Sequence, residues 1–143
     1  MKKNLIAIAL LLTTALVYWV VVRPDPVSER TVGNAGLANL VEVKLPQNLS
    51  PIAEDGKALF DANCIACHGQ DAAGNDGKGP PLVHKIYEPS HHGDESFQRA
   101  VALGVRGHHW RFGDMPPVQG VAREDVEKIV RYVRELQIAN GIE

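Results

Sequence analysis

The sequence predicts an all-α domain that follows an apolar N-terminal segment. Apolar residues near the end of the chain recur at the three- and four-residue spacing of a helix, and a second helical pattern precedes the two cysteines. No stretch has the pattern of a well-formed sheet. With 143 residues, the chain is expected to hold one domain in addition to the N-terminal segment.

The N-terminal segment has the properties of a membrane anchor. Leu5 to Val22 is an uncharged run of 18 residues, which as a helix would be about 27 Å long and would just span the hydrocarbon of a bilayer. Lys2 and Lys3 precede this run, and Tyr18 and Trp19 lie near its far end. By the positive-inside rule, we expect residues 1–22 to form a single-pass transmembrane helix in the cytoplasmic membrane, with the N-terminus inside and the domain in the periplasm or outside.

A cleaved signal peptide is the alternative for this segment. Thr13, Thr14 and Ala15 are small enough for a cleavage site, but cleavage there would leave Leu16 to Val22 as an exposed apolar stub. The anchor is therefore the preferred interpretation.

Residues 23–50 are expected to form an extracytoplasmic tether. This stretch contains three prolines and the segment Gly33–Gly36, and as a flexible chain it would reach about 30 Å. The alternation of Val41, Val43 and Leu45 with charged residues leaves a second interpretation, in which this part lies extended against the domain.

The domain proper is expected at residues 51–143, beginning with a helix from Pro51 to Cys67. Ser50 is a suitable N-cap, proline is favoured at the first helical position, and Gly69 ends the helix. The next stretch, Gln70 to Pro89, is rich in Gly, Asp, Asn and Pro and is expected to be an irregular loop.

Two further helices are expected. Asp94 to Leu103 is a short helix closed by Gly104. The last helix begins with acidic residues in its first turn and ends before Asn140, although Ala122 is a poor N-cap. Its apolar face should pack on the first helix; the residues of this face are Val126, Ile129, Val130, Val133 and Leu136 or Gln137.

Charge and cysteine content exclude several classes of protein. Residues 51–143 contain ten Lys and Arg against fourteen Asp and Glu, a balance that argues against binding nucleic acid. The two cysteines lie three positions apart and cannot close a long disulfide loop. A domain of roughly 90 residues often needs a cofactor to complete its core.

The sequence Cys64-Ile65-Ala66-Cys67-His68 matches the C-x-x-C-H pattern of covalent haem attachment. Thiols three residues apart on a helical turn point the same way, so both can bond to one haem, while His68 ligates the iron. A thioredoxin-like redox pair would require a βαβ setting, which the sequence lacks. A zinc site would require two more ligands from His84, His91, His92, His108 or His109.

From Pro51 onward the sequence resembles the class I monohaem cytochromes c, and its N-terminal segment makes it similar to their membrane-anchored bacterial type. In this family a Gly and an aromatic residue lie where the first helix crosses the last, and Gly56, Phe60 and Tyr132 occupy these places. The resemblance implies the small cytochrome c fold, with three to four helices around one covalently bound haem c.

Two further motifs carry the resemblance and imply cofactor-binding residues. Gly79-Pro80-Pro81-Leu82 matches a segment whose Pro80 carbonyl would accept a hydrogen bond from the His68 ring. Gly113-Asp114-Met115-Pro116 resembles the segment that supplies a methionine as second axial ligand. His68 and Met115 are thus the expected iron ligands, with Cys64, Cys67, Pro80 and Trp110 as further haem-binding residues.

This ligand set predicts an electron carrier and not an enzyme. An iron ligated by histidine and methionine has no vacant position for oxygen or peroxide. We expect one-electron transfer in a respiratory-type chain, between membrane-associated donor and acceptor proteins, without a small-molecule substrate. The alternatives are a haem subunit of an oxidase or reductase, a peroxidase-like enzyme, and a copper-linked protein that uses its histidine doublets.

Two histidine doublets, His91-His92 and His108-His109, do not belong to the family pattern. They are interpreted as parts of a solvated, hydrogen-bonding loop. Two alternatives are that His108 or His109 replaces Met115 on the iron, and that the doublets bind a copper-like ion. Trp110 is expected to hydrogen-bond a haem propionate or to cover the haem edge by apolar packing.

Overall fold

The computed structural model describes residues 39–143, and the expected transmembrane helix, residues 1–22, lies outside this range. The described residues form four α-helices and two short 3-10 helices; in chain order these are α2 (Pro51–Asn63), α3 (Ile65–His68), η1 (Gln70–Ala72), η2 (Lys85–Tyr87), α4 (Asp94–Leu103) and α5 (Arg123–Ala139). No strand occurs between residues 39 and 143, as expected for an all-α domain. Within the same range, every helix is too short or too polar to cross a bilayer.

The α2 helix begins as the sequence predicts. The hydroxyl of Ser50 accepts a hydrogen bond from the backbone N–H of Ala53, at 3.3 Å, and Pro51 occupies the first helical position. Ser50 also joins α2 to α5, because its hydroxyl donates to the carboxylate of Glu135 at 2.7 Å. The N-cap thus fixes both the start of α2 and its contact with the last helix.

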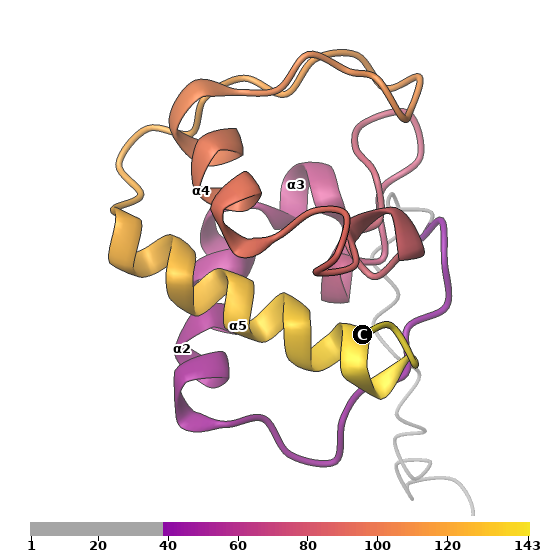
Figure 1. Ribbon diagram of the computed structural model, residues 1–143, viewed down its shortest axis with the longest axis vertical. Coiled ribbons are helices and arrows are strands. Elements are labelled where there is room, and N and C mark those ends of the chain that lie inside the picture. Colours follow the sequence, from indigo (N-terminus) through magenta and orange to yellow (C-terminus); the bar gives the residue numbers. More distant parts are fainter. Residues whose placement is uncertain (1–38) are drawn as a thin grey trace, which may run out of the picture. The chain divides into compact units, whose positions relative to one another are not determined.

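The crossing of α2 and α5 forms the centre of the domain (Figure 1). A Cβ atom on Gly56 would lie 1.9 Å from the carbonyl oxygen of Lys128, so only glycine permits this close approach. One turn further along α2, the rings of Phe60 and Tyr132 pack with their centroids 5.7 Å apart. The expected packing of the last helix on the first is therefore confirmed.

The expected continuous helix from Pro51 to Cys67 is wrong at Cys64, where α2 ends and α3 begins. Cys64 has φ −122° and ψ −26°, outside the helical region. Its carbonyl accepts hydrogen bonds from the N–H groups of both Cys67, at 3.1 Å, and His68, at 2.9 Å. The attachment motif is therefore a separate, tightened turn, closed at Gly69 with φ +72°.

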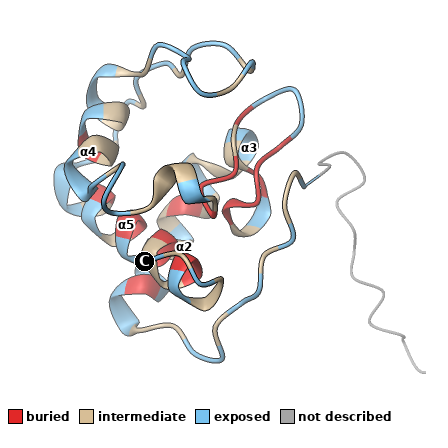
Figure 2. Ribbon diagram, turned by 45° about the vertical axis from the view of Figure 1, so that its right-hand side comes forward, coloured by how far each residue is buried: buried red, intermediate tan, exposed pale blue. Residues whose placement is uncertain are grey.

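The loop expected at Gln70 to Pro89 contains two turns of 3-10 helix that the composition did not predict. The second turn, η2, is capped by the ring of His84, whose Nδ1 accepts a hydrogen bond from the N–H of Ile86 at 3.2 Å. The carbonyl of Ala72 accepts a hydrogen bond from the N–H of Leu82 at 2.8 Å, and this bond brings the two ends of the segment between them together. Buried residues follow this segment and the facing sides of α2 and α5 (Figure 2).

The α4 helix has the predicted bounds, and α5 ends before Asn140 as expected. The α4 helix ends at Gly104, with φ +76°, and packs on α5. The α5 helix has no side-chain cap at Ala122; instead the carboxylate of Asp125 accepts the N–H of Ala122 at 3.2 Å. Only the reciprocal half of a capping box is thus present, in which the third helical residue accepts the N–H of the N-cap residue.

The described part of the expected tether, residues 39–50, lies extended against the domain. The N–H groups of Leu40 and Val41 donate to the carbonyl of Ala73 at 3.1 and 3.2 Å. The backbone of Lys44 exchanges two hydrogen bonds with the side-chain amide of Asn140, each of 2.9 Å. For residues 39–50, the interpretation as an extended segment packed against the domain is therefore confirmed, although these residues form no regular strand.

Candidate functional site

A cavity of about 220 Å³ lies among α2, α3, α4, α5 and the two irregular segments. Its wall is mainly apolar, with Phe60, Leu82, Phe97 and Ile129 from four different parts of the chain. Six residues that the sequence predicts to bind a cofactor line this one cavity: Cys64, Cys67, His68, Pro80, Trp110 and Met115. The fold thus gathers residues that are up to 51 positions apart in the sequence.

The two thiols occupy the start and end of the turn formed by the attachment motif. Cys64 is half-buried, Cys67 is exposed, and they do not form a disulfide. Burial, and secondarily the neighbouring Cys67, raises the pKa of Cys64 to about 11. A redox-active Cys-X-X-Cys pair needs a lowered thiol pKa, so the thioredoxin-like interpretation is not supported.

Asn75 positions this turn, although nothing in the sequence distinguishes it from other loop residues. Its side chain is 1% exposed, and its amide Nδ2 donates to the carbonyl of Ala66, between the two cysteines, at 2.9 Å. The backbone of Asn75 also bonds to Gly79. A Cβ on Gly79 would lie 2.6 Å from the carbonyl oxygen of Cys67, so glycine lets the loop approach the motif closely.

The imidazole of His68 is held in one tautomer. Its Nδ1 lies 2.9 Å from the carbonyl oxygen of Pro80, as expected. Because a carbonyl only accepts, Nδ1 carries the proton and Nε2 is left with a free lone pair. Burial lowers the pKa of His68, although the hydrogen bond to Pro80 opposes this effect. The neutral ring, which is the form that ligates a metal, is therefore favoured.

Met115 lies in the irregular segment that follows α4, and backbone hydrogen bonds hold it in place. Met115 and Val105 exchange two backbone hydrogen bonds, each of 2.9 Å. The carboxylate of Asp114 also accepts the N–H of Gly107 at 2.8 Å, which closes the loop between them. Met115 therefore lines the cavity from a loop whose two ends are joined by hydrogen bonds.

Trp110 lines the cavity with its ring. Its ring contacts the rings of His84 and Phe112, with centroid distances of 5.2 and 5.9 Å. The indole Nε1 is covered by protein atoms and makes no hydrogen bond of good geometry among the described residues, but it lies near the hydroxyl of Tyr87, where it opposes the rise in the pKa of Tyr87 that burial causes. Trp110 thus contributes apolar packing to the cavity wall, which is one of the two roles that the sequence predicts for it.

The structure does not place Cys64 and Cys67 in a zinc site. Among residues 39–143, His91, His92 and His109 form the one group of three or more potential metal ligands, and it contains neither cysteine. The other histidine of the chain's second doublet, His108, contacts this group but is not part of it. The zinc interpretation of the cysteines is therefore not supported.

These residues fit a covalently attached haem. The cavity offers an apolar wall for the porphyrin, two thiols for its edge and a neutral imidazole nitrogen for the iron. The residues that would hold the group are Cys64, Cys67 and His68, with Met115 facing the same cavity.

Comparison with known proteins agrees with this reading of the site. A family model described as Cytochrome c matches residues 53–137, which is more than half of the chain. The matched range extends from α2 to α5 and so includes the attachment motif and Met115. Neither the curated proteins nor the solved structures contain a match.

Proposed function

Because this chain belongs to the cytochrome c family, we propose that it is a one-electron carrier whose haem iron is ligated by His68 and Met115. Members of this family bind covalently attached haem c, so haem c is the cofactor of this chain. Haem-based electron transfer is the general function that follows from the family. The ligand pair, the pathway and the location are the parts that we propose.

The position of Met115 is the observation that carries the proposal. It shares a cavity with His68, and two backbone hydrogen bonds to Val105 hold it there. Haem iron supplies the one-electron chemistry, and a thioether ligand raises its reduction potential by favouring the ferrous state. The carbonyl of Pro80 orients the His68 ring, and the apolar wall keeps water from the iron.

An enzyme that activates oxygen or peroxide would need an open iron position. We propose that Met115 would ligate the iron of the bound haem, so that the haem would supply one-electron transfer without binding a substrate. The test is exposure of the reduced, haem-loaded chain to carbon monoxide. We expect no change in its visible spectrum within minutes, whereas rapid and complete binding would favour the peroxidase-like alternative.

We further propose that the chain is anchored in the cytoplasmic membrane by residues 1–22, with the haem domain outside. Anchoring would raise the local concentration of the domain near membrane-associated donors and acceptors of a respiratory-type chain. Docking to them would use a small, transient interface. After extraction of membranes at alkaline pH, we expect the full chain to stay in the membrane pellet; recovery in the soluble fraction, at a mass lacking the N-terminus, would favour a cleaved signal peptide.

A further inference from the structure

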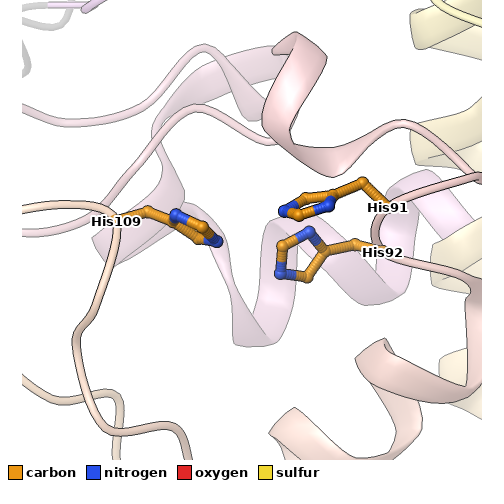
Figure 3. A group of neighbouring side chains, drawn as sticks. All are labelled: His91, His92 and His109. Atoms are coloured by element: carbon orange, nitrogen blue, oxygen red, sulfur yellow. The ribbon is translucent and has the colours of Figure 1, made fainter.

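The two histidine doublets, which the proposed electron transfer does not use, meet in space. His91 and His92 lie between η2 and α4, and His109 lies in the segment between α4 and α5. In Figure 3 the ring of His109 points across a gap toward the rings of His91 and His92. One ligand nitrogen from each of the three lies within 4.8 Å of the other two.

The ring of His92 is oriented as a metal ligand would be. Its Nδ1 lies 2.6 Å from the carbonyl oxygen of Ile86, so Nδ1 carries the proton and Nε2 is free. Metal-ligating histidines usually donate their other ring N–H to a carbonyl or carboxylate in this way. The exposed ring of His108 makes the same type of bond, to the carbonyl of Arg106 at 2.9 Å, so what distinguishes His92 is that its ring also belongs to the group of three.

The backbone that carries His92 is fastened to α5. The guanidinium of Arg134 donates to the carbonyl of His92 and to the carbonyl of Tyr87, each at 2.6 Å. The same guanidinium donates to the carboxylate of Asp94 at 2.9 Å, at the start of α4. Arg134 therefore holds the backbone of the His91-His92 pair in place against α5 and the start of α4.

The rings also lie close together: the ring centroid of His109 is 5.5 Å from that of His91 and 5.3 Å from that of His92. Neutral imidazole is the form that binds metal, and imidazole nitrogen suits zinc, copper and nickel.

We propose that His91, His92 and His109 bind one divalent first-row transition-metal ion of the Zn²⁺ or Cu²⁺ type at the rim of the haem cavity. A tetrahedral ion with bonds of about 2.0–2.1 Å needs its nitrogens about 3.3 Å apart, so small rotations of the exposed rings of His91 and His109 would complete the site. Water would occupy the fourth position. The ion would join the segment before α4 to the segment after it, which also carries Met115.

The test uses the full chain, loaded with haem and kept ferric, titrated with ZnCl₂ in a calorimeter. Zn²⁺ is redox-inert, so the haem is not reduced or oxidised by the probe. We expect one ion per chain. Replacing a ligand in His91→Gln or His109→Gln should weaken binding at least about tenfold, because even the loss of a residue that only orients a ligand has this effect.

His108→Gln is the matched control, since His108 adjoins His109 in the same doublet but lies outside the group of three. It should bind Zn²⁺ as the intact chain does, and the visible spectrum of the haem should be the same in all variants. If His109→Gln does not fold, His91→Gln decides alone. The proposal is overturned if the intact chain does not bind Zn²⁺ stoichiometrically, or if His91→Gln binds Zn²⁺ as tightly as the intact chain does. It is also overturned if His108→Gln weakens Zn²⁺ binding as much as the ligand substitutions do. A changed haem spectrum in His109→Gln would overturn it as well, because it would indicate that this ring ligates the iron.

Discussion

At the scale of single residues, Asn75 shows how a buried polar side chain supports the attachment turn. Its amide is the partner of the Ala66 carbonyl. In Asn75→Ala this carbonyl loses its partner and a buried side chain is removed, so we expect the free energy of unfolding to fall by about 1–3 kcal/mol. Denaturant unfolding of the haem-loaded protein measures this difference.

Asn63→Ala is the control for Asn75→Ala. The amide of Asn63 donates to the carbonyl of Leu59 at 2.8 Å, which is the same type of bond, but on the exposed surface. Water can replace it there, so a change below about 0.5 kcal/mol is expected. Equal effects of the two substitutions would show that Asn75 has no special role in the turn.

The residues with distinctive chemistry are those that the sequence predicts. Cys64, Cys67 and His68 are adjacent and of the required types, so their spacing is enough to suggest their roles. Asn75 is not predictable in this way, because its importance comes from a contact with Ala66 that only the folded loop creates. The meeting of His91 with His109 likewise depends on how two irregular segments lie beside each other.

At the scale of helices, the crossing of α2 and α5 depends on Gly56. In Gly56→Ala the new methyl group would meet the carbonyl oxygen of Lys128, which belongs to the backbone and cannot move aside cheaply. We expect a loss of about 3 kcal/mol or more in the free energy of unfolding. In the control, Gly93→Ala, the nearest atom to the new Cβ is 3.6 Å away, and the loss should be at most about 1 kcal/mol. Similar losses would contradict this account of the crossing.

The contact between α5 and the start of α2 should depend on pH through Glu135. Burial alone would raise the pKa of Glu135, but hydrogen bonds from the side chain and backbone of Ser50 and from Arg131 outweigh it and lower the pKa below its usual 4.5. A carboxyl group with a lowered pKa in the folded state stabilises the protein above its unfolded pKa, and this contribution is lost as the pH falls below that value.

The measurement for Glu135 is the free energy of unfolding at several pH values between about 6 and 3. The intact chain should be more stable than Glu135→Gln at the upper end, and the difference should shrink on acidification. Glu127→Gln, on the exposed side of the same helix, controls for the loss of one surface charge. A difference that stays constant over this range would show that the carboxylate is not stabilised by Ser50 and Arg131.

Helices with strong end signals are predicted well, and the irregular connections are not. Acidic first turns and the following Gly104 or Asn140 define α4 and α5 to the residue. The break at Cys64 and the turn at η2 depend on hydrogen bonds that composition does not indicate, such as the one from Ile86 to the His84 ring. Local sequence determines where a helix begins and ends, whereas the contacts of a loop come from the rest of the fold.

At the scale of the whole molecule, α2 and α5 pack closely, while the space between them and α4 is a cavity. The buried core lies between α2, α5 and the segment after α3, while the cavity wall includes α4 and the segment bearing Met115. A haem held in this cavity would take the place of a core between these two parts, as the small size of the domain predicts. Sequence alone indicates the need for such a group, and the fold determines which side chains face it.

The central claim is that Met115, together with His68, would ligate the iron of the bound haem, and the ferric visible spectrum tests it most directly. Sulfur ligation from methionine gives a weak red band in ferric c-type haem. We expect this band in the haem-loaded full chain and its loss in Met115→Ala, with the covalent haem retained. Absence of the band from the intact chain, or its persistence in Met115→Ala, would contradict the account.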